Sequence, residues 1–439
     1  MRKTRPPGPP YEVEIASLAQ DGRGVARRDG KAVFVDGALP GERVLVQPVA
    51  LHRQYDEAVT EQVLAPSPDR VEPRCAHFKL CGGCSLQHLR SERQIEFKQQ
   101  ALLDALTHIG KIAPKTVLAP LLGPAWGYRR KARLGMRFVR KMGRIAIGFR
   151  EKHSHFVTDV QACPILDAAV GDQIGALGEL VGRLERPDRI PQIEITVADQ
   201  GVALVIRHLQ PLSAADRTQI EAFAAPRDYA VYLQAGALES TIALRAPAAG
   251  LTYTHPAYGL RLAVHPQDFM QVNAEINRTM VPLVLDLLAP GRDEAVLDLF
   301  CGLGNFTLPL ATLAASVVGV EASAEMVRRA RANAEANALS NATFHTADLF
   351  GEIRHEGWAR ARFDKILLDP PRSGAKDLTR KLGSFRARRI VYVSCHPGTL
   401  ARDASELVHG QGYRLSAAGV LDMFPHTAHV ESVAVFDRN

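Results

Sequence analysis

The sequence has no apolar run long enough to cross a membrane, and its first ten residues lack the apolar stretch of a secretory signal peptide. Those ten residues are rich in arginine, lysine and proline instead, which predicts a short disordered basic leader. Internal repeats are absent too. These absences argue against membrane-spanning and secreted proteins, and we expect a cytoplasmic protein without a membrane partner.

Cysteine is scarce, with six residues in a chain of 439. A reducing cytosol disfavours disulfides, so clustered cysteines indicate a metal site or a catalytic thiol. Cys75, Cys81 and Cys84 lie close together, and Cys163, followed by proline, can supply a fourth ligand. Four thiolates suit a [4Fe–4S] cluster or a structural zinc. The spacing resembles a cluster more than the two close pairs usual for zinc, but it decides neither.

The chain is long enough for two or three domains, and 46% of its residues are hydrophobic, so it can bury a sizeable core. Residues 11–64 alternate like short strands and predict a small closed β-barrel, which either binds oligonucleotides or is purely architectural. Residues 91–109 predict an amphipathic helix. Strand signals return from 126 to about 264, and from about 269 strands alternate with helices, which predicts a doubly wound α/β domain.

Positive charge is concentrated in one segment of the chain. The formal net charge is +7, which favours a polyanionic partner only weakly. Between 126 and 153, however, ten basic residues accompany one acid, Glu151, with four aromatic residues among them. The basic residues are Arg129, Arg130, Lys131, Arg133, Arg137, Arg140, Lys141, Arg144, Arg150 and Lys152; the aromatic ones are Trp126, Tyr128, Phe138 and Phe149. This composition predicts a surface that binds RNA phosphates and unpaired bases, or alternatively a solvated basic face over buried aromatics.

A glycine-rich turn, with Gly302 and Gly304, follows the predicted strand that contains Asp298, and the next strand ends at Glu321. Glycines at such a turn let the backbone approach a ligand, and a carboxylate at the second strand can bind both hydroxyls of a ribose. Thr307 stands where a dinucleotide site needs its third glycine, which counts against NAD. Asp298 suits the cationic methionine end of S-adenosylmethionine, so we favour that methyl donor over another nucleotide.

Two further loops follow predicted strands, DPPR at 369–372 and SCHP at 394–397. Ligands of open α/β sheets bind at such strand ends, so Cys395 is well placed to be a nucleophile if its thiolate is favoured. Cys301, inside the glycine turn, reads as a packing cysteine. Near the C-terminus Glu431 follows His426 and His429 and can supply a general base, or these polar groups only cap a turn.

A nucleophilic cysteine and a general base together suit the methylation of a pyrimidine carbon. Carbon 5 of uracil is a poor nucleophile until a thiolate adds to carbon 6 and turns the ring into an enolate. After methyl transfer a base must remove the proton on carbon 5 so that the thiolate can leave. One cysteine and one base are the minimum requirement, and the chain offers Cys395 and Glu431. A base inside a helix cannot reach the thiol, so the target must be single-stranded or flipped out.

Four stretches together resemble the RNA uracil-5-methyltransferase family: DLFCGLGNF at 298–306, DPPR at 369–372, SCHPGTLARD at 394–403 and MFPHTAHVE at 423–431. A fifth, HPQDFMQVN at 265–273, is similar to the family's segment entering the catalytic domain. The resemblance implies Cys395 as nucleophile and Glu431 as base. It implies cofactor contacts from Gln271, Phe300, Asn305, Glu321, Asp348 and Asp369. The chain departs from the family at His396, where Asn is common, at His265, where Ser is common, and at Asp348, where some members have Asn.

The ribosomal branch of this family carries a [4Fe–4S] cluster on a similar cysteine pattern, which implies that Cys75, Cys81, Cys84 and Cys163 bind one. The resemblance further implies a Rossmann-like methyltransferase domain at 93–125 and 269–439, a TRAM-like, OB-like RNA-binding barrel at 1–66, and a β-rich central domain with the cluster at 67–92 and 126–268. The implied substrate is a specific uridine of 23S ribosomal RNA, with no obligate protein partner.

Three rival interpretations remain. A related enzyme with another ribosomal or transfer RNA target typically lacks the barrel or the cluster. A non-catalytic iron–sulfur RNA-binding assembly factor would not need Cys395 and Glu431 beside an intact donor site. A DNA cytosine-5-methyltransferase usually carries its nucleophile in a Pro-Cys motif where this chain has Asp369-Pro370-Pro371.

Overall fold

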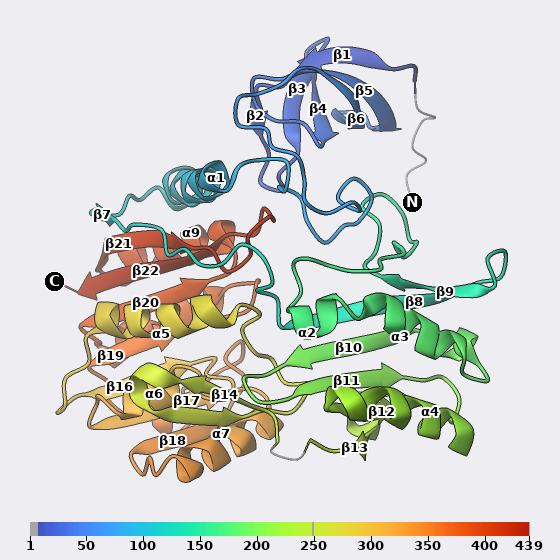
Figure 1. Cartoon of the computed structure of the whole chain (residues 1–439). Helices are drawn as coiled ribbons and strands as arrows, with labels where there is room; N and C mark the ends of the chain where they lie inside the picture. Colours follow the sequence, from blue (N-terminus) through green and yellow to red (C-terminus); the bar gives the residue numbers. More distant parts are fainter. Residues whose placement is uncertain (1–7, 248–249, 439) are drawn as a thin grey trace. The chain divides into compact units, whose positions relative to one another are not determined.

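The computed structural model describes residues 8–247 and 250–438, so most of the predicted basic leader lies outside the described residues. Contacts along the chain divide it into two compact units (Figure 1). The first comprises Met1–Lys98, Phe149–Thr158 and Phe424–His429, and the second comprises Gln99–Gly148, Asp159–Met423 and Val430–Asn439. Within the described ranges no helix is both long and apolar enough to cross a membrane.

The first unit contains a six-stranded sheet in the order β1-β5-β6-β4-β3-β2. Its strands are β1 (Tyr11–Glu14), β2 (Ser17–Leu18), β3 (Gly24–Arg28), β4 (Lys31–Asp36), β5 (Arg43–Leu51) and β6 (Tyr55–Ala65). Only the pairing of β4 with β6 is parallel. Alternate residues such as Val33, Val35, Val44 and Val46 form the core of the sheet, as the period-two pattern predicts. The cysteine-rich loop follows and leads into α1 (Ser91–Ala105), which confirms the predicted helix.

The second unit holds an eight-stranded sheet in the order β18-β17-β16-β19-β20-β22-β21-β7. Its strands are β7 (Thr116–Val117), β16 (Ala295–Leu299), β17 (Ser316–Glu321), β18 (Ala342–Thr346), β19 (Lys365–Leu368), β20 (Arg389–Ser394), β21 (Tyr413–Leu421) and β22 (Glu431–Arg438). Strands β16 to β20 run parallel, whereas β22 is antiparallel to both of its neighbours. The strand order reverses beside β16, which is where ligands bind in doubly wound folds.

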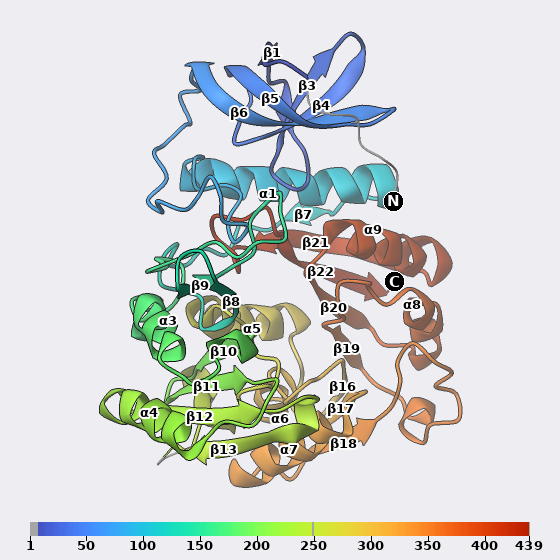
Figure 2. The ribbon, with the colours of Figure 1, turned by 90° about the vertical axis from the view of Figure 1, so that its right-hand side faces the viewer.

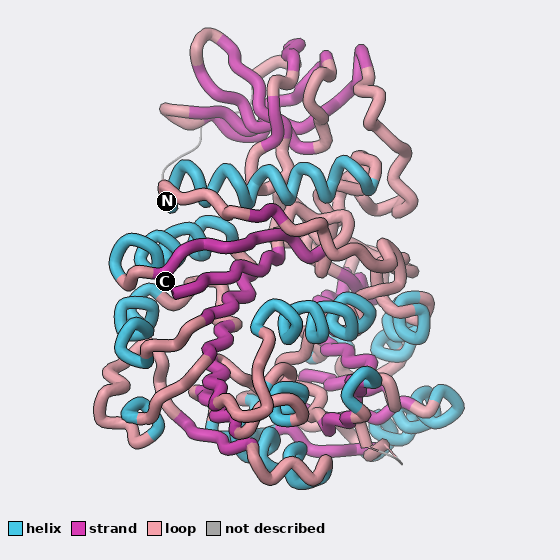
Figure 3. Tube along the Cα trace, turned by 90° about the vertical axis from the view of Figure 1, so that its left-hand side faces the viewer, coloured by secondary structure: helices cyan, strands magenta, loops and turns pink. Residues whose placement is uncertain are grey.

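Helices lie on both sides of this sheet, with α5 on one side and α8 and α9 on the other (Figure 2). The helices of this part are α5 (Ala274–Leu288), α6 (Thr307–Ala311), α7 (Ala324–Ala336), α8 (Lys376–Leu382) and α9 (Pro397–Ser405). The strands of the sheet are seen from the opposite side in Figure 3. This alternation of strands and helices confirms the Rossmann-like α/β arrangement expected from the sequence.

The same unit contains a second sheet in the order β13-β12-β11-β10-β8-β9. Its strands are β8 (Lys131–Val139), β9 (Arg144–Gly148), β10 (Gln192–Val197), β11 (Val202–Arg207), β12 (Tyr229–Gln234) and β13 (Thr241–Arg245). The helices that accompany it are α2 (Ala168–Gly171), α3 (Ile174–Gly182) and α4 (Ala214–Ala224), and a hairpin of β14 (Thr252–His255) and β15 (Leu260–Ala263) follows.

Short 3-10 and π-helical turns connect these elements. They are η1 (Leu106–Gly110), η2 (Pro187–Arg189), η3 (Ala225–Arg227), η4 (Leu238–Ser240), η5 (Pro256–Tyr258), η6 (Trp358–Arg360), η7 (Gly383–Phe385) and η8 (Glu406–Gly410). The amide of Leu118, just after β7, donates to Ala418 O over 2.8 Å, so the segment after α1 adds an edge strand to the Rossmann-like sheet.

Candidate active site

The glycine turn after β16 has a backbone that few side chains tolerate. Gly302 and Gly304 have φ values of +55° and +89°, and Phe300 has φ +66° although it is not a glycine. A Cβ on Gly304 would clash with Leu308 Cδ1, and the positive φ of Gly304 would strain any other residue there. Non-glycine residues held in the left-handed region cluster at ligand sites, which agrees with the predicted role of this turn.

Two carboxylates flank the turn. Glu321 accepts hydrogen bonds from Gly302 N at 3.3 Å and from Ser323 N at 2.9 Å, so it braces the turn from the end of β17. Asp298 is 1% exposed, and Thr307 Oγ1 donates to its Oδ2. Within the described residues its Oδ1 has no hydrogen-bond partner. Burial raises the pKa of Asp298 to about 7. A buried acceptor without a partner suits the cationic end of a methyl donor.

Asn305 does more than the sequence indicates. Its side-chain amide exchanges two hydrogen bonds of 3.0 Å with Asn277 on α5, and Tyr253 on β14 donates to its Oδ1 at 3.2 Å. The ring of His255 lies edge-on to that of Tyr253 with centroids 5.5 Å apart. The amide therefore ties the glycine turn to α5 and to the β14–β15 hairpin. Nothing in the local sequence of Asn277 or Tyr253 signals this function.

The other predicted cofactor residues lie along the same part of the chain. Asp348 follows β18 and accepts from Phe350 N at 2.9 Å, and the ring of Phe350 lies 5.8 Å from that of Phe300. Gln271 is half-buried in the segment between β15 and α5. Their contacts with a donor remain predictions.

Strand register brings the proposed nucleophile and base together. The ladder between β20 and β22 ends with Ser394 opposite Ser432, and Cys395 and Glu431 are the next residues of the two segments at that end. Asp369 directly follows β19, whose last residue Leu368 pairs with Tyr392 of β20. The three side chains therefore share one edge of the sheet, although they are up to 62 positions apart in the sequence.

The acidic groups at this edge of the sheet are buried, and burial raises their pKa values. Burial raises the pKa of Glu431 well above its usual value, and the nearby Asp369 raises it further. Burial also raises the pKa of Asp369 to about 7. The pKa of the Cys395 thiol rises to about 11 through burial, Glu431 and Asp369, while Arg372 opposes the rise. A cation bound beside these groups would lower all three pKa values.

The segment after Cys395 starts a helix that can favour its thiolate. His396 caps α9, with Nδ1 accepting from Thr399 N at 3.2 Å, and Pro397 is the first helical residue. This is the function that an Asn side chain performs at such a position, so the departure from the family pattern preserves the cap. The positive end of the helix dipole stabilises an anion next to it.

A buried network that the sequence does not signal fixes the DPPR loop to α9. Asp403 is 0% exposed and accepts from Tyr392 Oη at 2.8 Å and from Ala375 N at 2.6 Å. Arg402 donates to Ser373 O at 2.9 Å. The loop carrying Asp369 is thereby attached to the helix that follows the nucleophile.

Among the described residues, the structure shows no metal-binding group at the cysteines predicted to bind a metal. Cys75, Cys81 and Cys84 lie in the first compact unit and Cys163 in the second. Over 8–247 and 250–438, no three His, Cys, Asp or Glu side chains form a metal-binding group. The described residues therefore give no support to the predicted [4Fe–4S] cluster. Cys301, in contrast, is buried as predicted.

The basic segment is only partly a free surface. Arg130 forms an ion pair with Asp199, and Arg133, Arg144 and Lys152 form ion pairs with Glu194, Asp159 and Asp36. Tyr128 is buried. The RNA-binding surface therefore stays a prediction: acids partner four of its cations, although the side chains of Arg133 and Arg144 remain 66% and 47% exposed. The turn after β8, with Arg140 and Lys141, is exposed.

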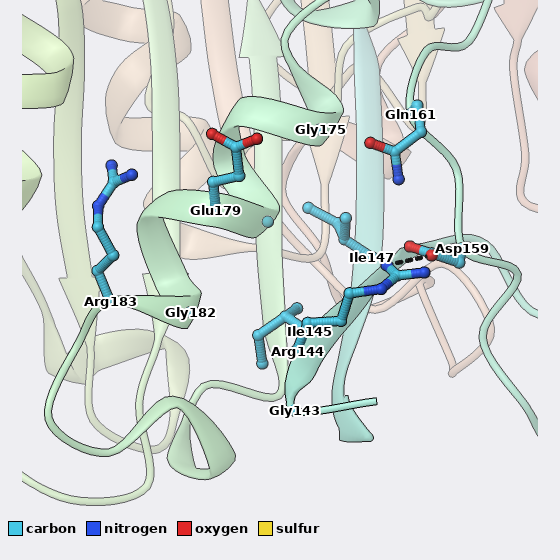
Figure 4. Close-up of a pocket in the computed structure, with 11 residues that line it drawn as sticks. Gly143, Arg144, Ile145, Ile147, Asp159, Gln161, Gly175, Glu179, Gly182 and Arg183 are labelled. Atoms are coloured by element: carbon cyan, nitrogen blue, oxygen red, sulfur yellow. Dashed lines mark ion pairs between the residues drawn. The ribbon is translucent and has the colours of Figure 1, made fainter. Parts of the chain in front are cut away.

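A hollow of about 730 Å³ lies between β9 and α3 (Figure 4). Its lining is Gly143, Arg144, Ile145, Ile147, Asp159, Gln161, Gly175, Gly178, Glu179, Gly182 and Arg183. None of the predicted catalytic or donor-binding residues contributes to its lining.

Comparison with known proteins agrees with this geometry. The family model described as tRNA (Uracil-5-)-methyltransferase matches residues 260–439, and the TRAM domain model matches residues 7–58. A protein of Alkalilimnicola ehrlichii named 23S rRNA (uracil(1939)-C(5))-methyltransferase RlmD is 52% identical over 100% of this chain and 98% of its own length. A protein of the same name from Stenotrophomonas maltophilia is 51% identical over 98% of this chain and 97% of its own.

Among solved structures, the chain is similar to the tRNA (uracil-54, C5)-methyltransferase of Pyrococcus abyssi, in complex with S-adenosyl-L-homocysteine. The TM-score is 0.74 at 25% identity, over 97% of this chain and 100% of that one.

Proposed function

The chain belongs to the RNA uracil-5-methyltransferase family, and from this premise we propose that it methylates carbon 5 of one uridine in 23S ribosomal RNA, at the uracil-1939-type site named for its ribosomal relatives. The observation that carries the chemistry is the strand pairing that sets Cys395 and Glu431 at the same end of the sheet, beside Asp369. The RNA target is supported by relatives at about 50% identity over the whole chain.

In the proposed mechanism the Cys395 thiolate adds to carbon 6 of the uracil. S-adenosylmethionine supplies the electrophilic methyl group that carbon 5 then accepts. Glu431 next takes the proton from carbon 5, the 5,6 double bond re-forms, and the carbon–sulfur bond breaks to return the thiolate. A cationic donor bound beside Cys395 and Glu431 would lower their raised pKa values, which would favour the ionised forms that both steps need.

We assign donor binding to the residues around the glycine turn. The buried, unpartnered Oδ1 of Asp298 supports a contact with a cationic group of the donor. The other residues proposed to hold it are Gln271, Phe300, Asn305, Glu321, Asp348 and Asp369. We also propose that the chain is divided into three domains. They are a barrel at 1–66, a central domain at 67–92 and 126–268, and a methyltransferase domain at 93–125 and 269–439.

The test uses S-adenosylmethionine labelled in its methyl group, with protein-free 23S and transfer RNA as separate substrates. Wild type, Cys395→Ala and the matched control Cys301→Ala would be compared, and the RNA digested and mapped. We expect label in 5-methyluridine at one 23S position, lost in Cys395→Ala and kept in Cys301→Ala. Label in transfer RNA and none in 23S RNA would contradict the proposed ribosomal substrate while keeping the chemistry. No label, with donor binding intact, would favour a non-catalytic assembly factor.

A [4Fe–4S] cluster on Cys75, Cys81, Cys84 and Cys163 belongs to the proposal as well, supported by cysteine spacing and by the ribosomal branch of the family. No step of the mechanism above uses it. Protein purified without oxygen should contain iron and acid-labile sulfide and absorb broadly in the visible range. Cys84→Ser should lose these signals and Cys301→Ser should keep them. Zinc in place of iron, or no metal, would overturn the assignment.

A further inference from the structure

The loop that precedes the proposed base Glu431 is held by residues that belong to neither β21 nor β22. Phe424–His429 joins β21 to β22, and the latter begins with Glu431. The loop belongs to the first compact unit, together with Met1–Lys98. Its described contacts therefore show which residues fix the chain just before Glu431.

Gln94 on α1 binds this loop at one residue, His426. Its Oε1 accepts from His426 N at 2.8 Å, and its Nε2 lies 3.2 Å from His426 Nδ1. The same Nε2 donates to Leu86 O at 3.0 Å and Leu89 O at 2.7 Å, so the amide is itself fixed. Gln94 is 2% exposed. A buried amide with this many partners holds the loop in one position.

Two neighbours complete the attachment. Ser85 donates its amide to His426 O at 3.0 Å, and its Oγ accepts from Ala428 N at 3.0 Å. Lys98, fully buried, donates from Nζ to Phe424 O at 2.9 Å. His426 has φ +64°, a conformation that a non-glycine residue keeps only where its surroundings impose it. The loop is thus held against its own backbone preference.

We propose that Gln94 is a positioning residue for Glu431: by fixing His426 it sets where β22 begins, and hence where the base stands relative to Cys395. This inference rests on the proposed function. Glu431 acts only after methyl transfer, when it takes the carbon 5 proton, the 5,6 double bond forms and the carbon–sulfur bond breaks. Loosening the loop therefore slows this last step, and the methylated RNA–protein adduct accumulates.

The experiment compares Gln94→Ala with Gln100→Ala, a matched control. Gln100 is exposed on the same helix and donates only to Asp104 within it, at 2.7 Å. With methyl-labelled S-adenosylmethionine and 23S RNA, we measure the denaturant-stable labelled adduct and the release of 5-methyluridine RNA. We expect Gln94→Ala to form the adduct at the wild-type rate and release product about 10²-fold more slowly, the size of effect typical of a base displaced by about 1 Å. Gln100→Ala should match wild type.

A second variant keeps the test decisive if Gln94→Ala does not fold. Ser85→Ala removes one hydrogen bond to the loop, and we expect it to slow release in the same direction by less. Release at the wild-type rate in the folded variants, or an equal slowing of adduct formation and release, would overturn the inference. Glu431→Gln distinguishes a failure of the proposed base from a failure of the positioning role. If it fails to accumulate adduct, the base assignment fails; if it accumulates adduct and the Gln94 and Ser85 variants do not, only the positioning role fails.

Discussion

The glycine turn at 298–306 and the basic segment at 126–153 both stand out in the sequence, yet the structure treats them differently. The turn has the backbone that its glycines predict, with a carboxylate on each side. In the basic segment, by contrast, at least four of the ten cations form ion pairs with acids from other parts of the chain.

The difference lies in what determines each feature. A strand–turn–helix backbone is set by neighbouring residues and by glycine's access to positive φ, so a short stretch of sequence contains the information. Whether a cation faces solvent depends on what packs opposite it, and Asp199 lies 69 positions from Arg130. Charge counted along the chain therefore overstates the charge available to RNA.

The largest expected effect distinguishes Cys395 from Cys301, two thiols of the second compact unit. Cys395→Ala should lower the rate of uridine methylation by about 10⁴-fold or more, because the covalent route is lost. Cys301→Ala should keep the rate within about tenfold, since this thiol only packs beneath the turn and its removal leaves a small cavity. Single-turnover kinetics with labelled donor measure both rates. Equal losses in the two variants would remove the distinction between a catalytic and a packing cysteine.

The next effect concerns Asp298. Asp298→Asn keeps the shape of the side chain and an acceptor for Thr307 but removes the negative charge. We expect affinity for S-adenosylmethionine to fall roughly 10- to 150-fold, the value of a hydrogen bond to a charged group. Titration calorimetry measures it. Unchanged affinity would show that the donor's cationic end binds elsewhere.

The same variant has a pH signature. The pKa of Asp298 is raised from 3.8 to about 7. The folded state therefore holds this proton more tightly than the unfolded chain, and its stabilising effect is lost as pH rises from about 4 through about 7. Asp298→Asn should consequently melt at a higher temperature than wild type at pH 8 and show little gain at pH 4. In the wild type, donor affinity should weaken as pH falls below about 7. The variant should lose this dependence.

Much of the fold follows from sequence periodicity, but the completed site does not. Strands, helices and the order of motifs along the chain are local patterns, and the sheet order places the motifs at one edge because parallel strands end together. That Cys395 and Glu431 end up at the same end of the sheet depends instead on β22 entering antiparallel beside β20. Tyr392 and Asp403 are ordinary strand and helix residues until the fold buries them in contact. Their function is invisible in a single sequence.

The smallest expected effect tests what remains of the basic surface. Replacing Arg140 and Lys141 with Gln should weaken RNA binding several-fold and reduce the slope of log K against log salt by about 1 per contact, with no change in melting temperature. Arg130→Gln should do the opposite, leaving the salt slope unchanged. It should lower stability by about 1–3 kcal/mol, because Asp199 keeps Arg278 and Thr254 but loses one buried partner. Filter binding across salt concentrations and thermal melts separate the two, and a salt slope that changes with Arg130 would restore that residue to the RNA surface.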